Sequence, residues 1–270
     1  MSGQAGRLPS GPKRATSNEN WHNSCMKLDA LAFGAHPDDV ELTCAGTLIK
    51  MNSIGYATGV ISLTQGELST RGNRTTRARE FAAAAEIMSV KAHAMLALPD
   101  GGIASSWEQK LAVIHEIRKY RPGVVFAPYW KDRHPDHARA SDLVREASFL
   151  SGLRKIETGQ EAHRPHRVIF YPCRYEFQPS FIVDISEFHN RKMEAILAYE
   201  SQFDSSANSR FGETETNISH PAFIRAIATR AKQYGSYIGV EYGEPFLVRE
   251  PLNLEDPIAF FGSDYLDTFI

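Results

Sequence analysis

Residues 35–39, with the sequence AHPDD, have the composition of a metal-hydrolase loop. They follow the apolar run 28–34, so His36, Asp38 and Asp39 stand at the end of an expected buried strand. These three side chains offer a nitrogen ligand, an oxygen ligand and a spare base. Because adjacent side chains at a strand end point in different directions, we expect one carboxylate to bind a metal ion and the other to face the substrate.

A second segment, residues 134–137 with the sequence HPDH, strengthens this interpretation. Histidine and aspartate also serve as ordinary turn and capping residues, but this segment again follows an apolar run, residues 124–127. In a parallel α/β sheet the carboxyl ends of neighbouring strands share one edge, and ligands bind there. The sequence therefore predicts that the two segments meet in space.

The elements that must position these residues alternate between strands and helices. Apolar runs predict the strands, and apolar residues at three- and four-residue spacing predict the helices between them. This order is typical of an α/β protein, and we expect a Rossmann-like three-layer sandwich with a mainly parallel sheet. Strands are predicted over residues 28–34, 56–63, 92–98, 124–127, 168–171 and 181–185, and helices over 41–53, 74–89, 187–203 and 222–234, with two more beginning at a Ser105–Glu108 capping box and near Pro135.

The first turn after the first strand excludes one familiar ligand of such folds. It reads GAHPDD (residues 34–39), where a dinucleotide-binding fold would have the glycine pattern G-x-G-x-x-G. A nucleotide-binding oxidoreductase is therefore not expected.

Composition agrees with one enzyme-sized domain. The chain has 270 residues, 42% of them hydrophobic and 23% charged, which is ordinary for a single large α/β domain. Its net charge of −2 gives no electrostatic footprint for nucleic acid or for an anionic membrane. No stretch approaches the ~18 apolar residues of a membrane span. We therefore expect a small-molecule substrate, with neither nucleic acid nor membrane as a partner.

The cysteines and the N-terminal segment indicate a cytoplasmic protein. Cys25, Cys44 and Cys173 form neither a C-x-x-C pair nor an even framework, so disulfides and thiolate zinc sites are not expected. Cys44 is expected to pack as a small apolar residue. Residues 1–26 are polar and lack the apolar centre of a signal peptide. We expect them to be a disordered extension of a single domain over residues 27–270.

The motifs together resemble the PIG-L/LmbE-like family of metal-dependent N-acetylglucosaminide deacetylases. The chain is most similar to the N-acetylglucosaminyl-malate deacetylases of bacillithiol synthesis, from about Lys27 to the C-terminal region. Two of the motifs are specific and family-wide, residues 35–42 (AHPDDVEL) and 132–137 (DRHPDH). Softer similarity to the malate branch lies in residues 64–72, 77–80, 99–100, 151–155, 198–203 and 239–244.

The resemblance implies a role for each residue of the two motifs. It implies that His36, Asp39 and His137 bind Zn²⁺, with another divalent ion such as Fe²⁺ as the alternative. Two imidazoles and a carboxylate leave a position open, as catalytic zinc sites do. It also implies that Asp38 is the general base and that His134 faces the developing oxyanion. Asp136 either orients and charge-stabilises the His134 imidazolium or merely caps its helix.

The implied reaction removes the N-acetyl group from an N-acetylglucosaminide, with N-acetyl-α-D-glucosaminyl L-malate as the expected substrate. Guanidinium groups are the natural bidentate partners of the malate carboxylates. Arg71, Arg77 and Arg133 lie in segments expected to rim the pocket. Arg77 is a pocket residue by resemblance, its alternative being an ion pair with Glu80 on the helix surface. Arg71 and Arg133 are as compatible with solvated surface positions as with positions in the pocket.

Several alternatives remain open at this stage. The substrate alternatives are another N-acetylglucosamine conjugate, carrying inositol or a chito-oligosaccharide, and a thiol conjugate cleaved at its amide. A non-catalytic metal- or sugar-binding protein would need the same ligands but no base, and Asp38 and His134 argue against it. The family resemblance also implies a homo-oligomer. The six other histidines lack a partner at ligand spacing and are expected on the surface or in the core: His93, His115, His163, His166, His189 and His220.

Overall fold

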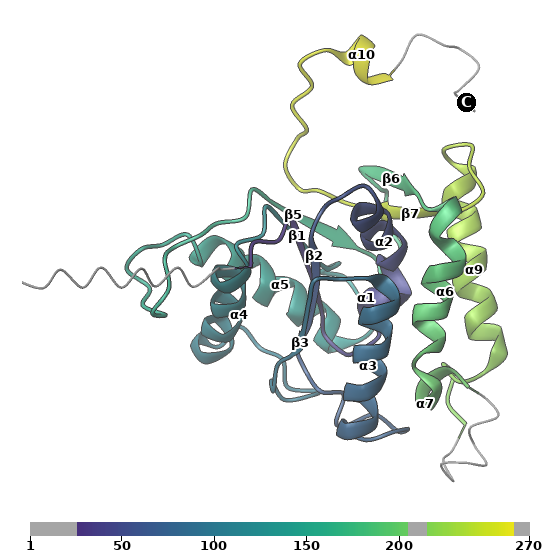
Figure 1. The fold of residues 1–270 in the computed structure, drawn as a ribbon, viewed down its shortest axis with the longest axis horizontal. Coiled ribbons are helices and arrows are strands. Elements are labelled where there is room, and N and C mark those ends of the chain that lie inside the picture. The colour runs from purple at the N-terminus through teal and green to yellow at the C-terminus, as the bar shows by residue number, and fades with distance from the viewer. Residues whose placement is uncertain (1–25, 205–214, 262–270) are drawn as a thin grey trace, which may run out of the picture.

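The centre of the protein is a parallel five-stranded sheet, which confirms the predicted fold class (Figure 1). The computed structural model describes residues 26–204 and 215–261, so the expected N-terminal extension lies outside the described residues except for Met26. The strand order is β3-β2-β1-β4-β5. The strands are β1 (Ala30–Gly34), β2 (Thr58–Ser62), β3 (Ala92–Met95), β4 (Val124–Pro128) and β5 (Arg167–Tyr171).

Helices cover both faces of this sheet and give the three predicted layers (Figure 1). Strand β1 is buried on both sides: Leu31 and Phe33 pack into one apolar cluster, and Ala30 and Ala32 into the other. Such continuous apolar runs are expected of parallel strands buried on both faces. One face carries α4 (Trp107–Tyr120) and α5 (Pro135–Leu150), and the other carries α1 (Asp39–Thr43), α2 (Ala45–Ser53), α3 (Arg74–Met88) and α6 (His189–Leu197).

The helix predicted over residues 41–53 is wrong in one respect, because it is divided into α1 and α2 at Cys44. The Glu244 carboxylate explains the division. It accepts hydrogen bonds from the backbone N–H groups of Gly46 (3.0 Å) and Thr47 (2.7 Å), which are free at the start of a helix. The Lys192 ammonium neutralises this buried carboxylate at 2.7 Å. Cys44 packs in the apolar cluster, as predicted.

Two other sequence predictions are corrected, and one strand was not predicted. Residues 187–203 form three short helices instead of one, and α4 is capped by the Ser106 hydroxyl, which accepts from Gln109 N, instead of by Ser105. The strand over 243–246 was not predicted, because its sequence contains glycine and proline. The additional elements are η1 (Ser186–Phe188), α7 (Glu200–Phe203), α9 (Pro221–Ser236), α10 (Pro257–Phe261) and the antiparallel pair β6 (Phe181–Asp184) and β7 (Gly243–Phe246).

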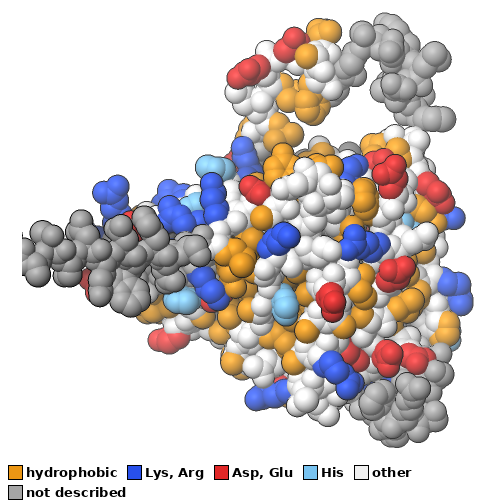
Figure 2. All heavy atoms as spheres, in the orientation of Figure 1, with side chains coloured by type: hydrophobic (Ala, Val, Ile, Leu, Met, Phe, Trp, Pro, Cys, Tyr) orange, Lys and Arg blue, Asp and Glu red, His pale blue; other side chains and the backbone are white. Residues whose placement is uncertain are grey.

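The surface carries charges of both signs over the face drawn in Figure 2. Within residues 26–204 and 215–261, no helix combines the length and the apolar character needed to cross a bilayer.

Candidate metal centre and active site

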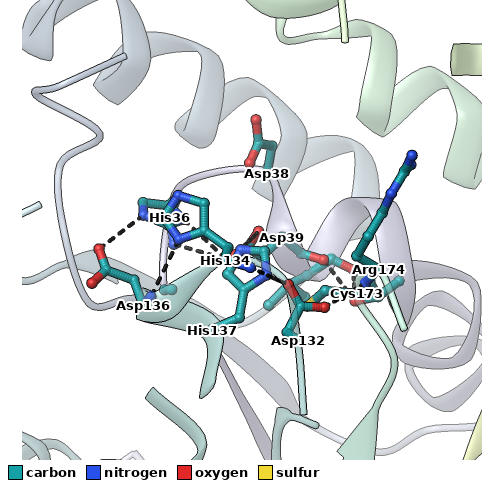
Figure 3. Close-up of polar contacts among 12 residues, drawn as sticks. His36, Asp38, Asp39, Asp132, His134, Asp136, His137, Cys173 and Arg174 are labelled. Carbon is teal, nitrogen blue, oxygen red and sulfur yellow. Dashed lines mark hydrogen bonds and ion pairs between the residues drawn. The ribbon is translucent and has the colours of Figure 1, made fainter. Parts of the chain in front are cut away.

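The two predicted segments meet at the carboxyl edge of the sheet, as the sequence indicated (Figure 3). His36 lies in the loop after β1, and Asp39 begins α1. His134 directly precedes α5, Pro135 is the first residue of this helix, and His137 lies in its first turn. Because β1 and β4 are neighbours, the side chains converge: Asp39 Oδ1 lies 3.2 Å from His137 Nε2, and Asp39 Oδ2 lies 3.5 Å from His36 Nδ1. Asp39 thus stands between the two imidazoles.

Asp132 fixes the orientation of His137. Its Oδ1 lies 3.0 Å from His137 Nδ1 and also accepts from the backbone N–H of His134 at 2.8 Å, while Oδ2 accepts from Arg174 N at 2.7 Å. Burial alone would raise the pKa of Asp132, but these hydrogen bonds lower it to about 2. An ionised carboxylate at Nδ1 keeps the proton there and leaves Nε2 free to face Asp39, as in carboxylate-supported metal histidines. Sequence reasoning gave Asp132 no role, although it lies in the motif DRHPDH.

His36 has the corresponding support from two carboxylates. Its Nε2 lies 3.2 Å from Asp100 Oδ1 and 3.4 Å from Asp136 Oδ2, so that Nδ1 is the nitrogen that faces Asp39. Burial alone would lower the pKa of His36, but contacts with these three carboxylates raise it well above its ordinary value. The surroundings therefore favour positive charge at this place. Asp100 was another residue that sequence reasoning missed, because it enters from the loop after β3.

The donors fit a divalent cation. Each imidazole has one nitrogen against a carboxylate and the other facing Asp39, which is the arrangement that metal-ligating histidines use. The mixed nitrogen and oxygen set suits Zn²⁺ or Fe²⁺ better than Mg²⁺ or Ca²⁺. Among the described residues, three groups have ligand atoms within 4.8 Å of one another: His36, His134 and His137; Asp39, His137 and Cys173; and His36, Asp100 and Asp136. The predicted set of His36, Asp39 and His137 is not itself one of these groups. It shares His36 and His137 with the first group, and Asp39 and His137 with the second.

Replacement of Asp132 by asparagine tests this supporting contact. We expect Asp132→Asn to bind zinc about 10- to 100-fold more weakly, because partners of this kind typically contribute that much to metal affinity. Competition with a chromophoric chelator measures the dissociation constant. Asp142→Asn, on the exposed side of α5, is the matched control and should bind as the wild type does. Equal affinity in the two variants would remove Asp132 from the supporting role.

Asp38 diverges from Asp39, as predicted, and points away from it (Figure 3). Its backbone has φ 116°, a left-handed conformation that glycine adopts readily and that among other residues is found mainly in asparagine and aspartate. Arg77 holds this conformation: its Nη2 donates to the Pro37 carbonyl and, at 3.1 Å, to Asp38 Oδ2. Burial raises the pKa of Asp38 against the opposing effect of Arg77. A buried carboxylate with a raised pKa is a better proton acceptor than an exposed one.

The alternative ion pair between Arg77 and Glu80 is not formed. Glu80 instead accepts from Ser201 through its backbone N–H (2.7 Å) and its hydroxyl (2.8 Å). Arg77 is 1% exposed and lies over the Tyr199 ring, 5.3 Å from the ring centroid. Its described contacts are therefore with the protein beneath Asp38, and a role in substrate binding stays a prediction.

His134 presents a neutral imidazole with a defined tautomer. Its Nδ1 accepts from the backbone N–H of Asp136 (3.2 Å), so Nε2 carries the proton. Burial lowers the pKa of His134, and the electrostatic influence of the nearby His36 and His137 rings lowers it further. One of the two expected roles of Asp136 is corrected, because His134 and not Asp136 caps the helix. The Asp136 carboxylate accepts from Gly101 N (2.7 Å) and faces His36, and its negative charge opposes the lowering of the His134 pKa. Asp136 orients His134 through its backbone.

The three arginines predicted to rim the pocket have different surroundings. Arg71 is 1% exposed, and its Nη2 donates to the backbone carbonyl of Asp204 at 3.0 Å, so the solvated alternative is wrong for it. Arg77 is buried beneath Asp38. Arg133 is exposed, next to His134. Its position is compatible with contact to a bound anion as well as with a solvated surface.

A parallel α/β sheet with histidines and carboxylates gathered at its carboxyl edge defines a Rossmann-like protein with a candidate hydrolytic metal centre. Comparisons with known proteins specify the family. The profile of the PIG-L family, GlcNAc-PI de-N-acetylase, matches residues 31–148. A diacetylchitobiose deacetylase of Thermococcus kodakarensis is 30% identical over 229 residues, which cover 79% of this chain and 80% of that protein. The chain belongs to the PIG-L family.

Solved structures of similar fold agree. A conserved protein of Thermus thermophilus has a TM-score of 0.76 at 40% identity, covering 85% of this chain and 98% of its own. An N,N'-diacetylchitobiose deacetylase of Pyrococcus horikoshii has a TM-score of 0.69 at 25% identity, covering 86% of this chain and 85% of its own. The 4-carboxy-2-hydroxymuconate hydratase of Pseudomonas putida has a TM-score of 0.68 at 21% identity, covering 86% of this chain and 99% of its own. At this identity the likeness shows the fold alone. Because a hydratase shares the fold, the reaction has to be argued from the residues.

Proposed function

We propose that this protein is a zinc-dependent deacetylase that removes the N-acetyl group from an N-acetylglucosaminide. The observation that carries the proposal is the position of Asp39 between two imidazoles, one supported by Asp132 and the other by Asp100 and Asp136, with Asp38 adjacent and turned away. Ligands alone would suffice for a binding protein. A buried carboxylate that takes no part in the ligand cluster is what a hydrolase additionally needs. Fe²⁺ is the alternative to Zn²⁺ at the same ligands.

The chain's own residues account for the steps of amide hydrolysis. A divalent ion bound at this site supplies a Lewis acid for the amide carbonyl and lowers the pKa of water. Asp38, held by Arg77, accepts the proton of the attacking water. His134 donates a hydrogen bond from Nε2 to the oxygen that becomes negatively charged, and a preorganised donor of this kind stabilises the transition state. The proton on Asp38 then passes to the departing amine.

For the substrate, we propose N-acetyl-α-D-glucosaminyl L-malate, the conjugate deacetylated in bacillithiol biosynthesis. Similarity of the softer motifs to that branch supports it, as does a guanidinium at an exposed position beside the site. Arg133 directly precedes His134 and is exposed, and we infer that its side chain reaches the mouth of the site. A dicarboxylate aglycone would find a charge-assisted partner there.

A chito-oligosaccharide is the second candidate substrate. The relatives from Thermococcus kodakarensis and Pyrococcus horikoshii are both named as deacetylases of diacetylchitobiose, which carries a second sugar where malate would stand. An uncharged aglycone needs no arginine at the mouth. The two candidates therefore differ in what they predict for Arg133.

The substrate proposal is tested by acetate release from N-acetylglucosaminyl-malate, N-acetylglucosaminyl-inositol and diacetylchitobiose, side by side. We expect the malate conjugate to have the highest kcat/KM. Arg133→Ala should reduce its advantage over the inositol conjugate about 10- to 100-fold, the effect of one charge-assisted contact. Arg139→Ala, an exposed arginine of α5, should leave the ratio unchanged. If wild type turns over the malate and inositol conjugates equally, the malate assignment is wrong, and a preference for diacetylchitobiose would support the second candidate.

A further inference from the structure

A cysteine approaches the candidate metal centre from a third strand. Cys173 comes shortly after β5, at the same edge of the sheet as the two histidine segments. Its sulfur, one oxygen of Asp39 and one nitrogen of His137 lie within 4.8 Å of one another (Figure 3). Cys173 forms no disulfide, and the residue is partly exposed. The mechanism proposed above gives it no role.

The backbone fixes this cysteine against the metal-binding histidine. The next residue, Arg174, donates its backbone N–H to Asp132 Oδ2 at 2.7 Å. Asp132 Oδ1 in turn holds His137 Nδ1 at 3.0 Å. One carboxylate therefore positions both the imidazole and the chain segment that carries the thiol, so the proximity of Cys173 to His137 is built into the fold.

We propose that Cys173 is a sulfur ligand of the ion that Asp39 and His137 bind. This inference rests on the proposed function only in taking the site to hold a metal. Zinc bonds of about 2.0 Å to nitrogen and about 2.3 Å to sulfur allow donors up to roughly 4.3 Å apart to share one ion, so small side-chain movements suffice. The S–H proton is released to solvent as the metal–sulfur bond forms, and nothing is oxidised or reduced.

Cys44 provides an internal contrast that argues for this assignment. It is fully buried in the apolar cluster and belongs to no donor group among the described residues. Cys173 instead faces charged groups. Ligand atoms of Asp39 and His137 lie close to its sulfur, and a coordinated metal ion deprotonates a thiol outright. Cys173 also packs against the edge of this cluster, so the two cysteines differ in that only Cys173 belongs to a group of possible metal ligands among the described residues.

A sulfur ligand would change the properties of the centre. Thiolates favour zinc, cobalt and cadmium over the harder ions manganese and magnesium. With His36, Asp39 and His137, a fourth protein ligand also completes a tetrahedral shell, which catalytic zinc sites leave open. The sulfur-bound form is therefore a resting state, and the ion has to release sulfur or add a fifth ligand before it can act on a substrate.

The absorption spectrum of Co²⁺ tests the proposal without reference to activity. Full-length metal-free protein is titrated with Co²⁺, and thiolate ligation gives an intense sulfur-to-cobalt charge-transfer band in the near ultraviolet beside the weaker visible bands of the ion. We expect this band in wild type, in Cys25→Ser and in Cys44→Ser. It should be missing from Cys173→Ser and Cys173→Ala, while their visible bands persist.

Each contrary result has a distinct meaning. Visible bands without a charge-transfer band in wild type, or a charge-transfer band that persists in Cys173→Ser, would overturn the sulfur ligand and leave the metal centre intact. Failure of wild type to bind Co²⁺ or Zn²⁺ at all would overturn both this inference and the proposed function. Affinity gives a second readout: Cys173→Ser should lose at least about tenfold more affinity for Cd²⁺ than for Mn²⁺, whereas a purely structural defect would weaken both ions alike.

Discussion

The His137→Ala variant is expected to retain almost no tightly bound metal and to release no measurable acetate. The substitution removes the nitrogen that lies 3.2 Å from Asp39 Oδ1, and Asp132 loses its contact with the imidazole. Of the three ligands predicted from the sequence, only His36 and Asp39 then remain, so the ion is no longer held tightly. Elemental analysis after gel filtration measures the metal content per chain.

His115→Ala is the matched control for this experiment. His115 lies on α4, exposed to solvent and paired with the neighbouring Glu116, and its loss should leave a full equivalent of metal in place. A full equivalent in His137→Ala would contradict the ligand assignment. A variant that loses metal and also fails to fold would show lowered thermal stability relative to metal-stripped wild type, so both proteins are compared in the metal-free state.

The Asp38→Asn variant is expected to keep its metal and to lose at least about 100-fold in turnover. Asparagine preserves the shape of the side chain and tolerates the left-handed backbone at this position. Its amide still accepts the hydrogen bond from Arg77, but it cannot take the proton of an attacking water. Metal content and kcat are measured on the same preparation.

Asp142→Asn is the control for charge removal at a surface aspartate, and it should turn over as wild type does. Two results would weaken the assignment of Asp38 in different ways. Near-normal turnover with metal still bound would remove Asp38 from the role of base. Loss of metal together with turnover would make Asp38 a ligand and leave the base unidentified.

The sheet and the meeting of the two motifs could be predicted because both depend on local sequence. Buried parallel strands are continuous apolar runs, and the rule that their carboxyl ends share one edge places His36 and His137 together without knowledge of any contact. The divergence of Asp38 and Asp39 likewise follows from the alternation of adjacent side chains.

The supporting residues could not be predicted, because they depend on contacts between distant parts of the chain. Asp100 reaches His36 from a third strand, and Glu244 divides the helix at Cys44 from almost two hundred residues away. Both lie in segments of softer family similarity, residues 99–100 and 239–244, but nothing in those segments indicates which group each carboxylate contacts. Asp132 is nearer, but its sequence position does not reveal which histidine nitrogen it meets.

The tautomer of His134 shows a limit of a different kind. The sequence left two roles open for Asp136, support of a His134 imidazolium by its carboxylate and capping of the helix. Which group of Asp136 contacts the ring depends on the first turn of α5, where the free backbone N–H groups favour a side-chain acceptor. The ring nitrogen fills that place, so the carboxylate turns to His36 and Gly101 instead.

Metal-dependent acetate release tests the central claim most directly. The protein is stripped with a chelator, and acetate release from the preferred N-acetylglucosaminide is followed as Zn²⁺ or Fe²⁺ is added back to wild type and to Asp38→Asn. The account predicts that stripped wild type is inactive and regains full activity with one equivalent of ion per chain, while Asp38→Asn binds the ion and stays at least about 100-fold slower. Undiminished acetate release by metal-free wild type would contradict it.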